Sequence, residues 1–218
     1  MIEYSLNLGS TMVRLKDDEK RKAILEAAIK VFAERGISST PTAAISKAAR
    51  IAEGTLFTYF NTKDVLINEL YISMKAEMAE AILTDLPETD DFRTTLEHIW
   101  KGYVTWGAAN PDKNKVISQL KVSEKLSCES FDRANGPFAV IEKRVNEAIA
   151  NKEVRAHSCE FMAAMMTGMA DVTMAFMHRA PHPEELQPEE PNIDYCKQGF
   201  EVLWNGIAMP VAVQKKNP

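Results

Sequence analysis

Two short helical segments joined by only about three residues constrain this chain more than any other feature. The segments are residues 42–49 and 53–60. Helices of this length are marginal in water unless a neighbour covers their apolar side. The preceding run KAILEAAIKVFAERG (22–36) can be that neighbour, because its apolar residues repeat at the spacing of an amphipathic helix: Ile24, Leu25, Ala28, Val31 and Phe32. The three segments together predict a helix-turn-helix unit.

The remainder of the chain shows helical rather than strand periodicity. No sustained alternation of apolar and polar residues bounded by turns is present. Further helices are predicted at residues 63–83, 89–109, 112–127, 137–151, 156–179 and 192–209. The stretch PHPEELQPEEP (181–191) is predicted to be an exposed loop, because its prolines and glutamates cannot build a packed core. The fold class is therefore predicted to be all-α.

The charge distribution predicts a basic head on an acidic body. Residues 14–63 hold ten Lys/Arg and six Asp/Glu, a formal charge of +4, whereas the whole chain carries −5, which leaves −9 for the rest. A basic head is attracted to phosphates while the body stays away from them. We therefore expect a flexible N-terminal arm at 1–13, a helix-turn-helix domain at 14–63 and a larger helical body at 64–218.

The octet EGTLFTYF (53–60) has the properties of a helix that reads DNA. Such a helix enters a groove about 12 Å wide, so small or hydrogen-bonding residues suit its N-terminal end. The residues that meet this requirement are Glu53, Gly54, Thr55 and Thr58. Leu56 and Phe60 are placed to anchor the opposite face. For Glu53 two interpretations stay open: it accepts a hydrogen bond from a cytosine amine, or it only stabilises the helix N-terminus.

Three side chains around this octet are predicted to contact DNA phosphates. Tyr59 and Lys63 lie near the end of the reading helix, where a phenol and an ammonium can reach the backbone. Thr42 begins the preceding helix and can offer its hydroxyl and its N–H group to another phosphate.

The run RKAILEAAIKVFAERGISSTPTAAISKAARIAEGTLFTYFNTKDVLINELY (21–71) resembles the DNA-binding domain of the TetR family of repressors. The resemblance is carried by Gly-Thr-Leu-aromatic-x-Tyr-Phe at 54–60, followed by Lys63 at the start of a long linker helix. It implies a homodimer that binds a palindromic operator and is released by an effector in the body, which spreads the two heads. The residues implied to contact DNA are Thr42, Arg50, Glu53, Gly54, Thr55, Phe57, Thr58, Tyr59 and Lys63.

Two positions in the head depart from the usual pattern of that family. Arg50 stands where the turn after the second helix usually has a glycine, and a left-handed conformation costs a non-glycine residue about 1 kcal/mol or somewhat more. Two interpretations stay open: contact with a phosphate offsets that cost, or the turn differs from the one usual in the family. Thr58 follows the first aromatic residue of the motif, at a position that is often aromatic or basic, so the base preference is expected to differ.

The body is similar, less strongly, to the Ram-type multidrug-responsive repressors of the same family. The matching stretches are HIWKGYVTWGAANPDKNKVISQLKVSEKLS and YCKQGFEVLWNGI. The residues implied to line an effector site are Tyr71, Met74, Trp100, Tyr103, Phe138 and Met166. Met166 replaces an aromatic residue and Ala163 an acidic one, so the effectors need not be the same. A small lipophilic effector, with a cationic one as a variant, suits methionines and aromatic rings.

Other interpretations of the body remain open. Each candidate pocket residue also suits an ordinary core, and the segments 161–177 and 192–209 suit a four-helix seam between two copies. A helical dimer that senses small molecules without binding an operator is the alternative function. No catalytic constellation or zinc-like spacing is found, so no enzyme activity, metal or cofactor is predicted.

The surroundings in which the chain works are also predicted. No apolar run approaches the ~20 residues of a membrane helix. Three scattered cysteines, Cys128, Cys159 and Cys196, favour reduced thiols and a cytoplasmic location.

Overall fold

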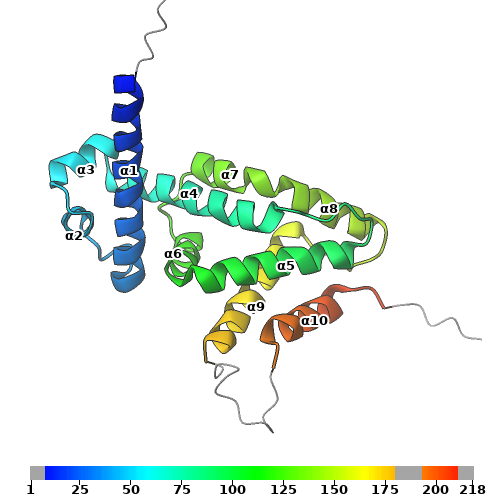
Figure 1. Cartoon of the computed structure of the whole chain (residues 1–218). Coiled ribbons are helices and arrows are strands. Elements are labelled where there is room, and N and C mark those ends of the chain that lie inside the picture. Colours follow the sequence, from blue (N-terminus) through cyan, green and yellow to red (C-terminus); the bar gives the residue numbers. More distant parts are fainter. Residues whose placement is uncertain (1–7, 180–192, 211–218) are drawn as a thin grey trace, which may run out of the picture. The chain divides into compact units, whose positions relative to one another are not determined.

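The computed structural model describes the backbone of residues 8–179 and 193–210, with side chains from residue 17 onward. Over these residues the chain is built from α-helices, one short 3₁₀ helix and a single isolated β-bridge between Val154 and Ala208 (Figure 1). The all-α prediction is confirmed. The loop predicted at 181–191 and the first residues of the predicted arm lie outside the described residues.

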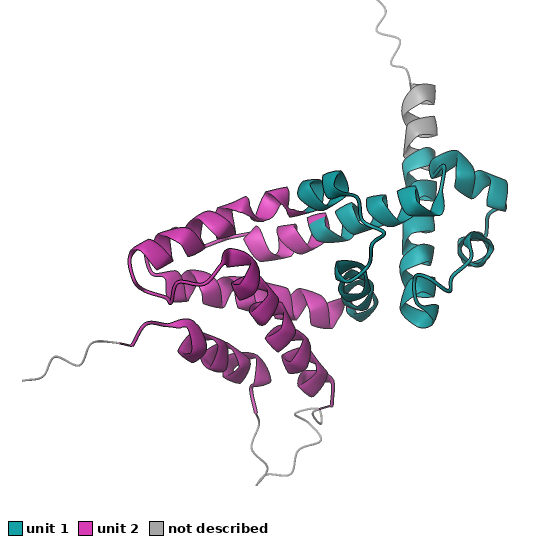
Figure 2. Cartoon of the chain, turned by 180° about the vertical axis from the view of Figure 1, so that it is seen from behind, with its two compact units in different colours: residues 1–75, 111–134 teal, residues 76–110, 135–218 magenta. Residues whose placement is uncertain are grey.

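The described chain divides into two compact units, which are coloured separately in Figure 2. Unit 1 contains the residues up to 75 together with 111–134, and unit 2 contains 76–110 together with the residues from 135 onward. This structural division differs from the functional boundary predicted near residue 64. The first part of the long helix α4 (Lys63–Leu83) therefore belongs to unit 1 and its second part to unit 2.

Unit 1 contains the helix-turn-helix head and two further helices. Its elements are α1 (Leu8–Arg35), α2 (Thr42–Ala48), α3 (Glu53–Tyr59), the start of α4, α6 (Pro111–Lys121) and α7 (Cys128–Asn135). The core residues of the head are Ile24, Ala28, Phe32, Ile45, Leu56 and Phe60, each at most 1% exposed. α1 ends at Gly36, whose φ of +83° favours glycine and whose N–H donates to the carbonyl of Phe32.

The structure differs from the sequence-based helix boundaries in two places. α1 begins at Leu8, inside the range 1–13 that was expected to be a flexible arm. The helix predicted at 112–127 ends at Lys121, and the sequence did not predict α7. α7 begins after Ser127, whose Oγ accepts the N–H of Ser130 at 3.1 Å, as an N-cap residue does.

Unit 2 is a packed group of helices around α5. Its elements are α5 (Phe92–Ala109), η1 (Gly136–Phe138), α8 (Ala139–Ala150), α9 (Cys159–Arg179) and α10 (Tyr195–Ile207). α5 packs on α8, α9 and α10. Asp91 begins α5 by accepting the N–H groups of Arg93 and Thr94, and the bonds from Thr94 and Arg93 lower the pKa of this carboxyl.

Trp100 fixes the approach of α10 to α5. Its indole is fully buried, and its Nε1 donates to the carbonyl of Cys196 at 2.8 Å. Gly199 makes this approach possible, since a Cβ there would lie 2.5 Å from Thr173 Oγ1 and 2.7 Å from Trp100 Cζ2. The helices therefore meet where only a glycine fits.

We predict that Gly199→Ala destabilises the protein by about 1–3 kcal/mol, because Trp100 and Thr173 must move to admit the methyl group. Gly206→Ala on the same helix is the control, since a Cβ at Gly206 meets nothing within 4 Å. It should be neutral or slightly stabilising, because alanine favours helix. Urea unfolding at one protein concentration measures both variants, and equal midpoints would contradict this packing.

Candidate nucleic-acid interface and effector cavity

The turn between α2 and α3 has a left-handed residue at Arg50, which is one of the two alternatives that the sequence left open. Its φ is +57°, its N–H donates to the Lys47 carbonyl at 3.2 Å, and the N–H of Ile51 donates to the Ser46 carbonyl at 3.0 Å. This pair of bonds is a Schellman motif, which satisfies carbonyl groups at the end of α2. Arg50 is exposed, so its guanidinium is held at the surface beside α3.

α3 has one anchored face and one open face. Leu56 and Phe60 are buried against the rest of the head, whereas Gly54 and Thr58 are exposed and the Phe57 ring is 40% exposed. A Cβ at Gly54 would meet nothing within 4 Å, so the protein itself does not require glycine there. The open face is therefore small and weakly charged at the end where a groove-binding helix contacts bases.

The first residues of α2 and α3 are joined by a hydrogen bond. The hydroxyl of Thr42 donates to Oε1 of Glu53 at 2.7 Å. In this structure the hydroxyl proton of Thr42 is donated to Glu53, and a contact of Thr42 with a phosphate stays a prediction. This bond could not be predicted from the sequence pattern, because the two residues lie in different helices.

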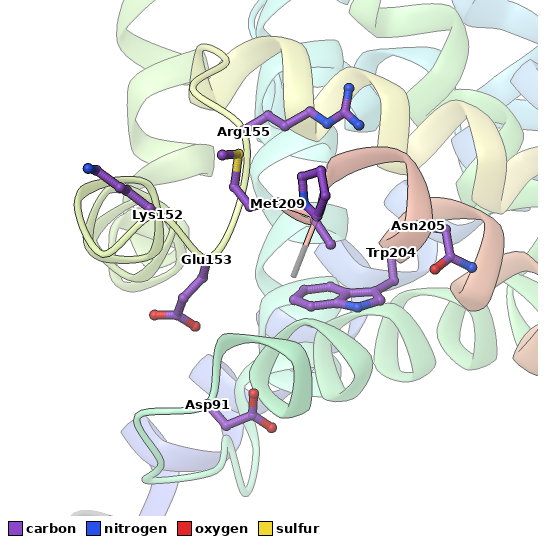
Figure 3. A pocket seen from close by; sticks show the side chains of 9 residues that line it. Asp91, Lys152, Glu153, Arg155, Trp204, Asn205 and Met209 are labelled. Carbon is purple, nitrogen blue, oxygen red and sulfur yellow. The ribbon is translucent and has the colours of Figure 1, made fainter. Parts of the chain in front are cut away.

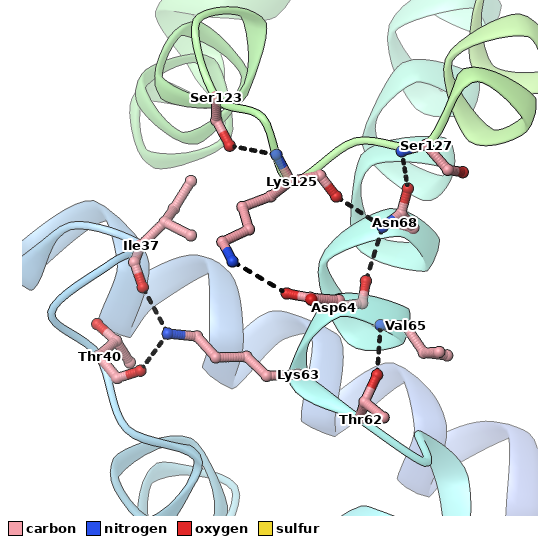
Figure 4. Close-up of polar contacts among 10 residues, drawn as sticks. All are labelled: Ile37, Thr40, Thr62, Lys63, Asp64, Val65, Asn68, Ser123, Lys125 and Ser127. Atoms are coloured by element: carbon pink, nitrogen blue, oxygen red, sulfur yellow. Dashed lines mark hydrogen bonds and ion pairs between the residues drawn. The ribbon is translucent and has the colours of Figure 1, made fainter.

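Tyr59 and Lys63, two predicted phosphate contacts, are hydrogen-bonded to other residues of the head. The hydroxyl of Tyr59 donates to Asp17 Oδ1 at 2.6 Å, and this bond raises the pKa of Tyr59. The ammonium of Lys63 donates to the carbonyls of Ile37 and Thr40 at 2.7 and 2.6 Å, and partial burial lowers its pKa (Figure 4). Both side chains thus hold the head together, a role that the sequence pattern did not reveal.

A second set of polar contacts ties the segment between α6 and α7 to α4. Asn68 donates to the Lys125 carbonyl at 3.0 Å and accepts the N–H of Ser127 at 2.9 Å, while the Lys125 ammonium lies 3.8 Å from Asp64 (Figure 4). Gln119 adds a contact to the head, because its Oε1 accepts the N–H of Ile37 at 3.3 Å. These residues were not predicted from the sequence, since asparagine and glutamine on helices carry no distinctive pattern.

Glu69 on α4 joins the first and last helices of unit 1. Its carboxylate lies 2.7 Å from the guanidinium of Arg21 on α1 and 3.8 Å from that of Arg133 on α7. Arg21 also lies over the ring of Phe60, 5.4 Å from its centroid. Each of these ion pairs is partly exposed, so each contributes little alone, and their value lies in fixing orientation.

Residues predicted to line an effector site fall in both units. Tyr71 and Met74 lie on the unit 1 part of α4, and Trp100, Tyr103, Phe138 and Met166 belong to unit 2. Tyr71, Met74, Trp100 and Tyr103 are buried, and Phe138 and Met166 are half-buried. Burial, with Asp171 as a second cause, raises the pKa of Tyr103, which therefore keeps its proton.

Met166 alone among the predicted effector residues lines a cavity described within unit 2. The cavity has a volume of about 60 Å³. Its lining residues come from α5, α8, α9 and α10 and are Leu96, Val145, Cys159, Met162, Ala163, Met166, Leu203 and Ile207. These side chains are aliphatic or carry sulfur, and none of them bears a formal charge. Burial raises the pKa of the Cys159 thiol, which keeps the wall neutral.

A larger pocket of about 650 Å³ lies at the end of α10. Figure 3 shows its lining side chains, among them Trp204 from α10, Asp91 from the start of α5 and Glu153 from the segment after α8. Its carboxylates already accept hydrogen bonds: Asp91 caps α5, and Glu153 accepts the N–H of Phe92 at 3.3 Å. The pocket is therefore a polar surface hollow whose acidic groups already stabilise the fold.

One buried cation was not anticipated from the sequence. Lys75 on α4 is only 9% exposed, and burial together with the nearby charge of Lys121 lowers its pKa to about 8. Among the described residues, no group of three His, Cys, Asp or Glu side chains is placed to hold a metal ion. His182 and Glu184, which also lacked a metal-like spacing in the sequence, lie outside these residues. No helix of the described ranges is long and apolar enough to cross a membrane.

Comparison with known proteins identifies the class to which this head belongs. Residues 24–70 match the family of bacterial regulatory proteins, tetR family. The uncharacterized HTH-type transcriptional regulator YhgD of Bacillus subtilis (strain 168) is 34% identical over 171 residues, which cover 76% of this chain and 87% of that protein. The chain therefore belongs to the TetR family of transcriptional regulators, and it is not an enzyme.

Solved structures agree with this assignment. A tetR family transcription regulator from Shewanella sp. PV-4 superposes with a TM-score of 0.73 at 28% identity, covering 88% of this chain and 99% of that one. The regulator FadR of Bacillus subtilis, solved in complex with stearoyl-CoA, has a TM-score of 0.62 at 19% identity, covering 85% and 98%. At that identity the second likeness concerns the fold.

We predict that Arg50→Gly weakens DNA binding but does not destabilise the protein. Glycine removes the left-handed strain, so stability should stay equal or rise by up to about 1 kcal/mol. The slope of the logarithm of the binding constant against the logarithm of salt concentration should become shallower by about 1, which corresponds to one lost phosphate contact.

Lys152→Gly is the matched control for this variant. Lys152 has a φ of +60°, and it ends α8 with the same two hydrogen bonds, from its own N–H to Ile149 and from that of Glu153 to Ala148. Thermal unfolding should respond alike in both variants, while only Arg50→Gly should change DNA binding in a salt titration. Unchanged binding by Arg50→Gly would remove Arg50 from the interface.

Proposed function

We propose that this chain is a ligand-responsive transcriptional repressor that binds a palindromic operator as a homodimer. The observation that carries the proposal is the placement of α3: Leu56 and the following Phe60 are buried in the head, while Gly54, Phe57 and Thr58 stay exposed. A helix anchored in this way presents one face of stable orientation to a major groove. The TetR family membership supports the same function.

The DNA contacts are proposed to divide into two kinds. Arg50 and the exposed Lys47 at the end of α2 would contact phosphates and set the position of the head. The side chains proposed to face base edges are Glu53, Gly54, Thr55, Phe57 and Thr58. Phe57 is an apolar group suited to a thymine methyl. Thr42, Tyr59 and Lys63 would act by holding α2 and α3 in place.

A second copy of the chain is proposed to cover one face of α9. Its exposed apolar side chains recur at helical spacing, at Phe161, Met165, Val172 and Phe176, with exposed Gly168 in the middle of the stripe. Val202 on α10 is 64% exposed. Such a stripe on two neighbouring helices suits a four-helix seam, and Gly168 permits close approach.

The effector is proposed to be a small lipophilic molecule that inserts an uncharged apolar group beside Met166. The cavity wall supports this choice, because it is aliphatic and sulfur-containing and bears no carboxylate to neutralise a cation. A cationic effector of the Ram type would lack its acidic partner at Ala163. The solved complex of FadR with stearoyl-CoA provides a precedent within this fold for a ligand with a long hydrocarbon chain.

Operator binding is tested on DNA from directly upstream of the chain's own coding region, where TetR-type repressors would regulate themselves. At physiological salt the protein should bind this duplex at least about 10³-fold more tightly than a shuffled duplex of the same composition. Fluorescence anisotropy with both duplexes measures the ratio. Equal affinity for the two would favour the alternative, a helical sensor that does not recognise an operator.

Ala163→Leu tests the effector cavity, because the added carbons would fill most of its volume of about 60 Å³. Release of operator DNA by decanol or decanoate should require at least about tenfold more ligand, since burial of each methylene contributes about 0.8 kcal/mol. Decyltrimethylammonium should release DNA least well from the unchanged protein.

The control is Ala164→Leu, an exposed neighbour on α9 that does not line the cavity. Both variants should bind operator normally without ligand. A response to decanol that survives Ala163→Leu unchanged would place the effector elsewhere.

A further inference from the structure

Glu53 is an unexpected residue at the reading end of α3. It is the first residue of the helix, it is exposed, and it is the only charged residue of α3. A carboxylate brought close to DNA is repelled by the phosphates on both strands. The neighbouring Gly54 is open, so a groove surface could approach the Glu53 side chain without obstruction by the protein.

The carboxylate of Glu53 is held in one orientation. Its Oε1 accepts the proton of the Thr42 hydroxyl at 2.7 Å, and Thr42 is itself the first residue of α2. A free glutamate on a helix surface samples several rotamers, and fixing one costs conformational entropy. Here the bond across the two helices has already fixed it. The second carboxylate oxygen, Oε2, keeps its acceptor sites.

We propose that Glu53 is a specificity-determining residue that accepts a hydrogen bond from a cytosine amino group in the major groove, and that Thr42 is its positioning residue. This inference rests on the proposed operator binding, and it predicts a cytosine at one position of that operator. An ionised carboxylate offers acceptors only, so it pairs with a base edge that offers a donor.

The chemistry of the four bases sets the order of preference. Cytosine presents its N4 amino group as a donor, whereas guanine presents the acceptors O6 and N7 and thymine the acceptor O4. Adenine presents a donor beside an acceptor, so it is tolerated less well than cytosine. Guanine and thymine leave the carboxylate facing acceptors in a desolvated groove, which gives the largest loss of affinity.

The test places each of the four bases in turn at every position of the operator half-site. Fluorescence anisotropy measures the affinity of the protein for each of these duplexes. The unchanged protein should prefer cytosine over guanine and thymine at one position by roughly 5- to 150-fold. Glu53→Gln should move the preference at that position to adenine, because an amide pairs with both the donor and the acceptor of adenine.

Thr42→Val and Thr42→Ser test the positioning role. Thr42→Val should flatten the preference at the same position and leave the other positions and the salt dependence unchanged. Thr42→Ser, which keeps the hydroxyl, should restore it. If Thr42→Val retains the full cytosine preference, Thr42 does not position Glu53. A variant that lowers thermal stability but leaves the base preference unchanged would lead to the same conclusion.

Glu34→Gln is the control for charge, since Glu34 is an exposed acid of α1. Glu34→Gln should strengthen binding to every duplex by a similar factor, because it removes a negative charge and no contact with a base. If Glu53→Gln does only this, Glu53 has no part in reading bases and the inference is overturned. If the unchanged protein binds no duplex more tightly than the shuffled control, the proposed function is overturned as well. That result is obtained before any variant is made, so the two failures are distinguishable.

Discussion

The head depends on burying one side of two helices that are too short to be stable alone. α2 and α3 contain seven residues each, about two turns, and isolated helices of that length do not persist in water. Ile45, Leu56 and Phe60 supply the missing stabilisation because they are buried in the core of the head, where α2 packs on both α1 and α3. The Schellman turn at Arg50 sets the angle between the two short helices. The exposed face of α3 is oriented only because its other face is buried.

Polar groups then fix what apolar packing leaves free. Lys63 bridges the two carbonyls of the connection that leads to α2, Tyr59 binds Asp17, and Thr42 binds Glu53. In these bonds the donors of Lys63, Tyr59 and Thr42 bind acceptors within the head. The result is a head in which the first residues of α2 and α3 are tied together, while Arg50 and Lys47 are exposed at the end of α2.

The sequence predicted those features that follow from periodicity and from backbone geometry. The all-α fold and the buried pair Leu56 and Phe60 could be predicted because each follows from local periodicity, whereas the conformation at Arg50 was left open. The sequence did not predict α7, since the break after Lys121 is set by the cap at Ser127 rather than by any proline or glycine. It also did not predict the two carbonyls that bind Lys63, because Ile37 and Thr40 are distant from it in sequence; the phosphate contact of Lys63 stays a prediction.

The body shows the same division between local and tertiary information. Its methionines and aromatic residues were recognised, but the sequence could not separate those that pack from those that line space. Trp100 is fixed by a hydrogen bond to Cys196 and by close contact with α10 at Gly199, whereas Met166 lines a cavity. The packing of α5, α8, α9 and α10 together decides which apolar residue lies beside a cavity.

Hydrogen exchange in the presence of operator DNA tests the central claim most directly. The account predicts that the duplex slows exchange of backbone amides in residues 42–60, where α2, the Arg50 turn and α3 meet the groove, and that a shuffled duplex does so much less. Protection confined to the body, or equal protection by both duplexes, would contradict the claim that α3 of this TetR-family head reads an operator.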